Sequence, residues 1–339
     1  MKTKSQLLLI LIFSTLISNN IHSLNCVTKN NDNSRKYVIS GWSSGFFSNF
    51  LGMLNQLYYA ERSNLIPVII WGPVFLYYEP TAPSGNAWEY YFEPVSHLKY
   101  EPTDRIGNAT YRGDQWWPHR YSPSGYQIPE NTVHQYNQDI RNLCYGLINK
   151  YIKIKPHIQD KVNAFYQQNM QGNVTIGIHL RGSDKYTEVG HVNHYQMLVK
   201  ANQLAQQFGP NTQFFVATDE QRLLNLAKAH LNGKIIHQDT TKTESLHNLS
   251  HVQSILQQHA GQVNKLILGE EVLIDALLLA RCNAFVHSIS LVSQGAAYFN
   301  PHMPCYLVTR QPKKSLADYS MHLINSCLQR FALIMKILR

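Results

Sequence analysis

Short apolar segments alternate with helical segments through the second half of this chain, and this alternation constrains the fold more than any other feature. Runs of β-branched and other apolar residues predict buried strands at residues 174–180, 213–217, 233–237 and 284–288. Helical patterns lie between them, near residues 193–208, 220–231 and 270–282. Strands that alternate with helices form parallel βαβ units, so the sequence predicts a Rossmann-like α/β half. A last strand, at residues 305–309, follows a turn bracketed by two prolines.

The first half of the chain begins with the same pattern. Tyr37–Ser40 predicts a short strand, a helix follows from about Phe50 to Arg62, and Pro67–Trp71 predicts a second strand. Residues 72–135 are rich in Pro, Tyr and Trp, which predicts long ordered loops. A helical stretch over residues 137–170 is broken near Pro156. This half therefore also starts as a doubly wound α/β unit.

The composition suits a globular protein that binds an anion. The chain has 339 residues, of which 44% are hydrophobic, and a formal net charge of +9. A basic balance fits an anionic small molecule, a nucleic acid or an anionic glycan. No dense stripe of Lys and Arg with interleaved aromatic residues is present in the sequence, which disfavours nucleic acid.

The N-terminus has the features of a targeting segment. Lys2 and Lys4 precede an apolar run, Leu7–Ile17, that is shorter than the roughly 20 residues of a membrane span. We expect residues 1–23 to be a signal peptide that is cut after Ser23, and a short uncleaved anchor is the alternative. Either way the rest of the chain is expected in the lumen of the secretory pathway, secreted, or in the periplasm of a bacterium.

The chain has five cysteines. In an oxidising compartment one or two disulfide pairs are expected to form, with one cysteine left over. Their spacing contains no CxxC or Cys/His pattern that would predict zinc. Three sequons, which start at Asn108, Asn173 and Asn248, are glycosylation acceptors in a eukaryotic host.

The predicted strand at residues 174–180 ends in a crowd of polar side chains: His179, Arg181, Ser183, Asp184 and Lys185. Ligands of open α/β sheets bind at the carboxyl ends of strands. The planar guanidinium of Arg181 is suited to phosphate oxygens. The segment therefore predicts an anion site, and a surface loop that carries a solvated Arg–Asp pair is the alternative.

Three segments, in order, resemble the motifs of the GDP-fucose transferases, most closely those of the α1,6-fucosyltransferases of the nodulation and core types. Residues 179–188, His-Leu-Arg-Gly-Ser-Asp-Lys-Tyr-Thr-Glu, resemble the first motif. Residues 214–228, with Ala-Thr-Asp at the end of a strand, resemble the second. Residues 272–290, from Val-Leu-Ile-Asp to Ser-Ile-Ser, resemble the third. The three motifs cover residues 176–300.

The resemblance implies a GT-B-type α/β fold, with two Rossmann-like domains that face a cleft. The expected division is an acceptor-side domain over residues 24–170, a GDP-sugar-binding domain over residues 171–311, and a helix over residues 312–339 that packs back across both. The implied activity is inverting transfer of fucose from GDP-fucose to a glycan hydroxyl, with an α1,6 linkage. Transfer to protein hydroxyls and an inactive sugar-nucleotide- or glycan-binding protein are the alternatives.

The implied partners are GDP-fucose and a glycan or glycoprotein acceptor, whose identity the sequence does not reveal. Nucleic acid is not expected, and a membrane is expected only if the N-terminal segment is retained. No cofactor is expected beyond the donor substrate. The sequence also contains no Asp-x-Asp run of the kind that metal-dependent transferases use, so we expect no metal ion.

Four residues of the first motif are expected to carry the chemistry. Arg181 would neutralise the diphosphate leaving group, unless it only pairs with Asp184. Inversion needs a base for the acceptor hydroxyl, and Glu188 lies where the family has its Thr-Glu carboxylate. One residue is missing between Lys185 and the Thr-Glu pair, so Asp184 competes for the role of base. Lys185 would hold the catalytic carboxylate or reach the diphosphate.

The donor pocket is expected to include His179 and four residues of the other two motifs. Asp219 is either the cap of a helix that begins near Glu220 or a ligand of the donor. Asp275, in a helix that is apolar nearly all round, matches the residue that holds guanine in the family; the alternative is a buried tie from helix to loop. Ser288 and Ser290 suit phosphate oxygens at a helix start, although hydroxyls there are also simple caps.

The first half offers a weaker set of candidates for the acceptor side. Gly45 would allow close approach of a ligand, and Asn49, Asn55 and Gln56 are candidates to face the cleft. The same residues suit a tight turn and an ordinary helix. Aromatic residues of this half are candidate sugar platforms or core packing: Trp88, Tyr90, Tyr91, Trp116 and Trp117.

Overall fold

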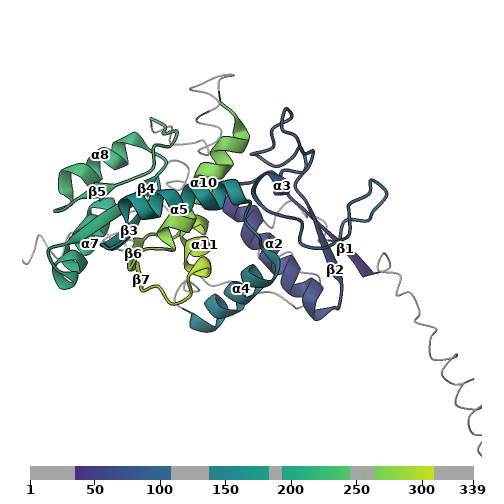
Figure 1. The fold of residues 1–339 in the computed structure, drawn as a ribbon, viewed down its shortest axis with the longest axis horizontal. Helices are drawn as coiled ribbons and strands as arrows, with labels where there is room; N and C mark the ends of the chain where they lie inside the picture. Colours follow the sequence, from purple (N-terminus) through teal and green to yellow (C-terminus); the bar gives the residue numbers. More distant parts are fainter. Residues whose placement is uncertain (1–34, 108–136, 183–192, 245–254, 256–262, 309–339) are drawn as a thin grey trace, which may run out of the picture.

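The computed structural model describes residues 35–107, 137–182, 193–244, 255 and 263–308 (Figure 1). Its N-terminal part is a parallel pair of strands, β1 (Lys36–Ser40) and β2 (Ile66–Ile70), in which Val38 lies opposite Val68. Helix α2 (Phe46–Arg62) connects them. It begins four residues before the predicted start, because Phe46 and Phe47 are buried in its first turn and extend the apolar face toward Gly45.

The second half forms a parallel five-stranded sheet, as the alternating pattern predicted. Its strands are β3 (Val174–Leu180), β4 (Thr212–Thr218), β5 (Ile235–Ile236), β6 (Ala284–His287) and β7 (Cys305–Leu307), in the order β5-β4-β3-β6-β7. The connecting helices are α7 (His194–Phe208), α8 (Gln221–His230), α10 (Lys265–Leu279) and α11 (Leu291–Phe299). This strand order is that of one half of a doubly wound α/β fold.

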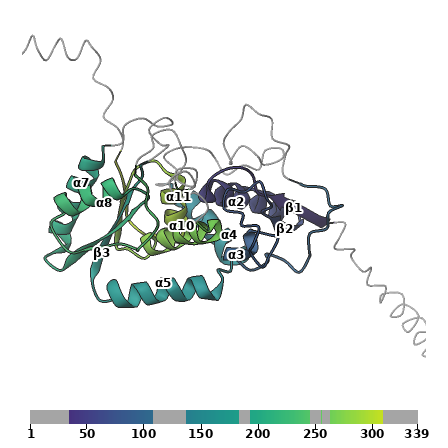
Figure 2. The same cartoon turned by 90° about the horizontal axis from the view of Figure 1, so that it is seen from above.

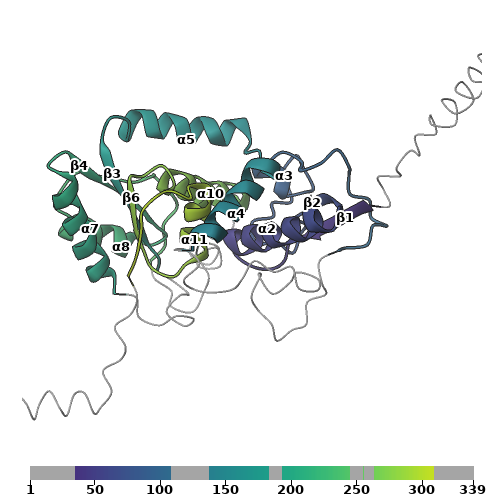
Figure 3. The same ribbon diagram turned by 90° about the horizontal axis from the view of Figure 1, so that it is seen from below.

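Between the two sheets the chain forms a short helix, α3 (Trp88–Tyr91), and two longer ones, α4 (Gln138–Tyr151) and α5 (Pro156–Asn169). The predicted break near Pro156 is confirmed, with this proline in the first turn of α5. Figure 3 shows α5 alongside the β3–β6 sheet, and the ring of Phe165 lies 5.7 Å from that of Phe215 in β4. Helix α5 therefore covers part of this sheet.

The two faces of the five-stranded sheet belong to different hydrophobic clusters because strand side chains alternate. Ile176, Ile178 and Leu180 pack with α7 and α8 on one face. On the other face, Phe215 and Phe285 join a cluster that continues through α10 and α11 into α2 and β1. Figure 2 shows α10 and α11 between the five-stranded sheet and the α2–β1–β2 unit. The predicted division into domains stays a prediction.

Within the described ranges, no helix is both long enough and apolar enough to cross a bilayer. The predicted signal segment and the predicted helix over residues 312–339 lie outside the described residues.

Candidate functional site

The strand order of the large sheet reverses between β3 and β6. From β3 the chain proceeds outward to β4 and β5, and it then returns to β6 on the other side. Ligands of such sheets bind outside the carboxyl ends of the strands at this reversal. His179 and Arg181 lie at the end of β3, and Ser288 follows β6. The structure thus brings polar residues from separate motifs to one edge of the sheet.

Asp219 follows the neighbouring strand β4 and holds the Arg181 side chain. Its Oδ2 accepts a hydrogen bond from Arg181 Nη1 at 2.6 Å, and its Oδ1 accepts one from the Gly182 backbone N–H at 3.2 Å. The Arg181 side chain is still 18% exposed. The guanidinium is therefore fixed in orientation and remains reachable from solvent.

The sequence interpretation of Asp219 as a helix cap is wrong. Helix α8 begins at Gln221 with Glu220 at its N-cap position, so Asp219 lies one residue too early. Its carboxylate instead contacts the turn after β3, a partner 37 residues away in the chain. The alternative pairing of Arg181 with Asp184 involves a residue outside the described ranges.

The turn after β3 is also enclosed by Glu220 and His194. A Cβ atom at Gly182 would collide with the carboxyl group of Glu220, which is fully buried and accepts a hydrogen bond from Arg222 Nη2 at 3.0 Å. His194 Nε2 lies 2.8 Å from the carbonyl oxygen of Arg181. A carbonyl can only accept, so this nitrogen carries the proton. Arg181 and Gly182 are therefore held by contacts from two other segments of the chain.

His179 is buried at the end of β3, and its Nδ1 lies 2.8 Å from Ser293 Oγ in α11. Burial, together with the positive charge of Arg181, lowers the pKa of His179 to about 3. The ring is therefore neutral at physiological pH and is suited to hydrogen bonding, not to charge neutralisation. Ser293 is not among the donor-pocket residues expected from the sequence.

Sequence reasoning also missed His287, the register partner of His179 on β6. Burial lowers its pKa to about 4, and its Nδ1 lies 3.0 Å from the carbonyl oxygen of Ser288. The neutral ring therefore donates to this carbonyl and fixes the backbone from which the Ser288 side chain projects. Its position immediately before Ser-Ile-Ser was the available signal.

The segment between β6 and α11 carries the two predicted serines. Ser288 is 2% exposed, and its hydroxyl has no hydrogen-bond partner among the described residues. Ser290 is the N-cap residue of α11, but its side chain makes no cap hydrogen bond. A buried hydroxyl without a partner is unfavourable, and the helix start beside it carries backbone N–H groups. Both features fit the binding of anionic oxygens.

Asp275 projects from α10 and accepts a hydrogen bond from Gln238 Nε2 at 2.6 Å. This contact is the helix-to-loop tie that the sequence allowed, and it leaves the second carboxylate oxygen available. Burial raises the pKa of Asp275 to about 7, against the opposing effects of the Gln238 hydrogen bond and the Lys242 charge. The charge of Asp219 also contributes to this shift.

The acceptor-side candidates are held by the protein itself. Asn49 is fully buried, and its amide bonds with the loop that precedes α2. Gln56 accepts a hydrogen bond from the Tyr37 hydroxyl in the core, and Asn55 is buried nearby in α2. These contacts are those of a turn and an ordinary helix. Gly45 differs, because a Cβ there would meet nothing within 4 Å.

The structure corrects part of the interpretation of the aromatic residues as sugar platforms. Trp88, Tyr90 and Tyr91 are buried in the aromatic core around Phe46 and Trp71, so they present no free ring face. Trp116 and Trp117 lie outside the described residues. The same holds for the catalytic candidates Asp184, Lys185 and Glu188, whose roles stay predictions.

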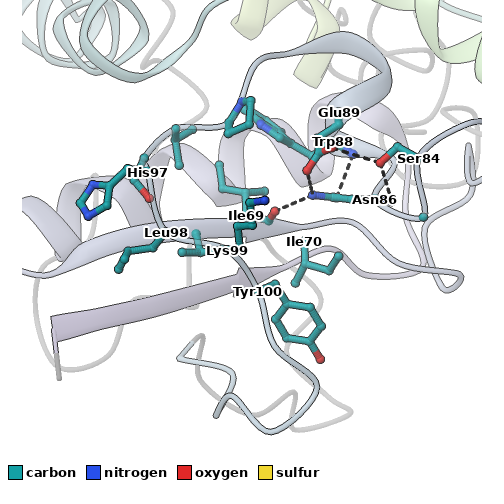
Figure 4. Close-up of a pocket in the computed structure, with 15 residues that line it drawn as sticks. Ile69, Ile70, Ser84, Asn86, Trp88, Glu89, His97, Leu98, Lys99 and Tyr100 are labelled. Atoms are coloured by element: carbon teal, nitrogen blue, oxygen red, sulfur yellow. Dashed lines mark hydrogen bonds between the residues drawn. The ribbon is translucent and has the colours of Figure 1, made fainter. Parts of the chain in front are cut away.

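A pocket of about 520 Å³ lies in another part of the molecule, along β2 and residues 84–100. Figure 4 shows Asn86 and Glu89 on one side of it and the ring of Tyr100 on another. The Asn86 amide donates to the carbonyl oxygen of Ile69 at 2.8 Å and to Glu89 Oε1 at 3.2 Å. The Asn86 and Glu89 side chains of this pocket thus bond with each other. Of the candidate residues named from the sequence that the structure describes, Trp88 alone lines it.

Metal ligands do not gather in the described part of the chain: no three His, Cys, Asp or Glu side chains there are placed to hold an ion. Metal independence stays a prediction.

Comparisons with known proteins find similarity at the level of structure. No protein-family model matches the sequence, and no curated protein does. The structure is similar to NodZ α-1,6-fucosyltransferase of Bradyrhizobium in a crystal soaked with GDP-fucose, at 18% identity and a TM-score of 0.48, over 84% of this chain and 96% of that chain. POFUT1 in complex with GDP is 12% identical, with a TM-score of 0.47, over 81% and 99% of the two chains. FUT1 of Arabidopsis thaliana in complex with GDP is 10% identical, with a TM-score of 0.46, over 82% and 72%.

Proposed function

We propose that this protein is an inverting, metal-independent glycosyltransferase that transfers fucose from GDP-fucose to a glycan hydroxyl, forming an α1,6 linkage. The observation that carries the proposal is the Arg181 guanidinium, fixed by Asp219 at the strand-order reversal and still open to solvent. The resemblance of residues 179–188 to the first motif of the GDP-fucose transferases names the donor.

Arg181 would stabilise the leaving group. Negative charge accumulates on the diphosphate as the glycosidic bond to fucose breaks, and a positioned guanidinium stabilises this charge more in the transition state than in the ground state. Because Asp219 and the enclosed turn fix the guanidinium beforehand, little reorganisation is needed during the reaction.

The rest of the nucleotide would lie along the same edge of the sheet. The Ser288 hydroxyl and the first N–H groups of α11 suit phosphate oxygens. Asp275 has a carboxylate oxygen to offer to the N–H groups of guanine. The acceptor hydroxyl would lose its proton to Glu188 or Asp184, as the motif resemblance implies, and the hydroxyl oxygen would attack the anomeric carbon opposite the departing GDP.

The test is a transfer assay with the purified protein, labelled GDP-fucose and a glycan array, with and without a chelator. We expect fucosylated product in both conditions and loss of roughly 10²–10³-fold in kcat for Arg181→Ala. Arg35→Ala is the matched control, since Arg35 bonds only with Asn64 among the contacts described and lies at the start of β1. Thermal melts of both variants check folding.

Four outcomes would contradict parts of the proposal. Faster hydrolysis of another sugar nucleotide would overturn the donor. Normal turnover by Arg181→Ala would overturn the leaving-group contact. Labelling of a folded protein acceptor in place of glycans would favour protein O-fucosylation, and glycan binding without any turnover would favour the non-enzymatic alternative.

A further inference from the structure

The pocket of about 520 Å³ lies along the edge of β2 that does not pair with β1, and side chains occupy this edge. Asn86 Oδ1 accepts from the Trp71 backbone N–H at 2.8 Å, and Asn86 Nδ2 donates to the Ile69 carbonyl oxygen at 2.8 Å. Ser96 Oγ donates to the Pro67 carbonyl oxygen at 2.6 Å. A peptide that added to β2 as a further strand would have to displace these bonds, so the pocket is suited to a ligand that binds through side chains.

Glu89 brings a carboxylate to this pocket, and neutral groups fix it. Its Oε1 accepts from Asn86 Nδ2 at 3.2 Å, and its Oε2 accepts from Ser84 Oγ at 3.1 Å (Figure 4). Among the described residues, no cation forms an ion pair with Glu89. A carboxylate oxygen can accept more than one hydrogen bond, so both oxygens keep the capacity to accept from a ligand.

An aromatic ring and a cationic residue line the same pocket. Tyr100 is 36% exposed and makes no ring contact with a described residue, and Figure 4 shows its ring across the pocket from Asn86 and Glu89. Lys99, the preceding residue, is also exposed and lines the pocket. The ligand would therefore meet an acceptor-only carboxylate, a donor-only ammonium group and a flat apolar surface.

A neutral sugar matches these groups better than an ion does. A sugar hydroxyl both donates and accepts, so neighbouring hydroxyls can donate to Glu89 and accept from Lys99. The C–H face of a pyranose can pack on the ring of Tyr100. A cation would be repelled by Lys99, and an anion by Glu89. The volume lies within the usual range of small-molecule sites.

We propose that this pocket is a glycan-binding subsite that holds a neutral sugar unit of the acceptor at a distance from the Arg181 turn. That the bound glycan is an acceptor rests on the proposed function. β2 belongs to the two-stranded sheet and Arg181 follows β3 of the five-stranded sheet, and Figure 2 shows α10 and α11 between them. A glycan that reaches both places is held at two points, so the subsite should favour long acceptors over short ones.

The first experiment measures binding of the labelled full-length protein to an array of neutral, sialylated and amine-bearing oligosaccharides, without GDP-fucose. We expect binding to neutral glycans. Tyr100→Ala should weaken it roughly tenfold because the stacking surface is lost, whereas Tyr100→Phe keeps the ring and should bind like the original protein. Tyr145→Ala is the matched control, since Tyr145 is 37% exposed on α4 and does not line the pocket.

Glu89→Gln tests the polar side of the pocket. The glutamine keeps the size of the side chain, and its oxygen can still accept from Asn86 while its amide donates to the Ser84 hydroxyl. It removes the charge and one acceptor, so we expect glycan binding to fall several-fold. Thermal melts check folding, and Tyr100→Ala tests the proposal independently because its side chain is exposed.

Transfer kinetics separate the subsite from the reaction centre. With GDP-fucose, Tyr100→Ala should raise KM roughly tenfold for the longest glycan that is fucosylated. Its kcat, its affinity for GDP and its KM for the shortest fucosylated glycan should remain those of the original protein. A variant that only loosened the fold would change these other quantities as well, and that result would contradict the subsite.

The remaining outcomes distinguish the subsite from the proposed function. The inference is wrong if the original protein binds no glycan on the array, or if Tyr100→Ala and Glu89→Gln bind as it does. Binding confined to sialylated or amine-bearing glycans would overturn the neutral class of ligand. If neutral glycans bind through Tyr100 but no fucose is transferred to any of them, the pocket is a glycan site and the proposed function is wrong.

Discussion

The loop after β1 and the turn after β3 occupy equivalent places in their sheets, yet they use polar residues differently. Both follow the carboxyl end of a parallel strand, where ligand sites are expected. Asn49, near the start of α2, bonds back to the loop after β1, where its carbonyl oxygen accepts from the Trp42 N–H at 2.8 Å. Its amide nitrogen donates to the backbone oxygens of Trp42, Ser44 and Gly45. The hydrogen-bonding capacity of this side chain is thus used inside the loop.

At the end of β3, by contrast, the Arg181 side chain remains 18% exposed. Asp219 orients Arg181 without covering it, and the Ser288 hydroxyl on the adjacent strand end has no partner among the described residues. The difference indicates that a polar residue at a strand end has a structural role where its partners are all internal. It is a candidate for ligand binding where a donor or acceptor is left over.

The largest effect on stability is therefore expected at Asn49. Asn49→Ala removes four hydrogen bonds and leaves backbone oxygens of the loop without a donor, so we expect a loss of about 2–4 kcal/mol in the free energy of unfolding. Denaturant unfolding measures it. The control is Asn142→Ala on the exposed side of α4, which should change stability by less than about 0.5 kcal/mol. A loss at Asn49 no larger than the control's would contradict the structural role.

A pair of glycines gives the next comparison. Gly182→Ala places a Cβ against the buried carboxyl group of Glu220, and displacing that group should cost about 1–3 kcal/mol of stability. It should also weaken GDP binding, because the turn carries Arg181. Gly45→Ala meets open space at a backbone φ of −61°, so its stability should change by less than about 1 kcal/mol. Thermal melts and GDP titrations of both variants test this, and equal losses would contradict the enclosed turn.

The order of the strands and helices could be predicted from the sequence because the hydrophobic period is a local signal that each element carries. β3 has its predicted bounds, and Pro156 marks the start of α5 as expected. The early start of α2 could not be predicted in the same way. Its first turn is stabilised by tertiary burial of Phe46 among Trp71, Phe75 and Tyr91, which no local pattern reveals.

The location of the candidate site could be predicted from the sequence, but the hydrogen-bond partners of its residues could not. Parallel strands have their carboxyl ends at one edge, so Arg181, Asp219 and Ser288 had to lie near one another. The partners depend on packing between distant segments. Asp219 contacts a turn 37 residues away instead of its own helix, and His179 meets Ser293 across 114 residues.

A smaller effect is expected from the titration of Asp275, whose pKa burial raises to about 7. Because the folded pKa lies above the unfolded one, the protonated form stabilises the fold below about pH 4, and this contribution is lost as the pH rises through 7. GDP binding needs the ionised form, so its affinity should change in the opposite direction. We expect a gain of roughly tenfold between pH 6 and pH 8 from this group.

Asp275→Asn provides the reference for both measurements. Comparing the two proteins cancels the titration of the GDP phosphates, which both proteins bind, and much of that of the neighbouring Glu271 and Lys242. Burial lowers the pKa values of His179 and His287, so these two groups make stability rise with pH between about 3 and 6.5, opposite to the effect of Asp275. Both histidines are present in the variant as well, so the comparison also removes their contribution. Identical pH profiles for the two proteins would contradict the assignment to Asp275.

The smallest effect on stability is expected at Ser288. Its sign distinguishes a polar residue that stabilises the fold, such as Asn49, from one whose hydroxyl is left for a ligand. Removing a buried hydroxyl that has no partner relieves a desolvation cost, so Ser288→Ala should leave the ligand-free protein unchanged or up to about 1 kcal/mol more stable. The same change should weaken GDP binding several-fold, since a phosphate oxygen would lose its donor. Thermal melts with and without GDP measure both effects in one experiment. Destabilisation of the ligand-free protein, as at Asn49, would mean that the hydroxyl already has a partner and that the strand end after β6 serves the fold.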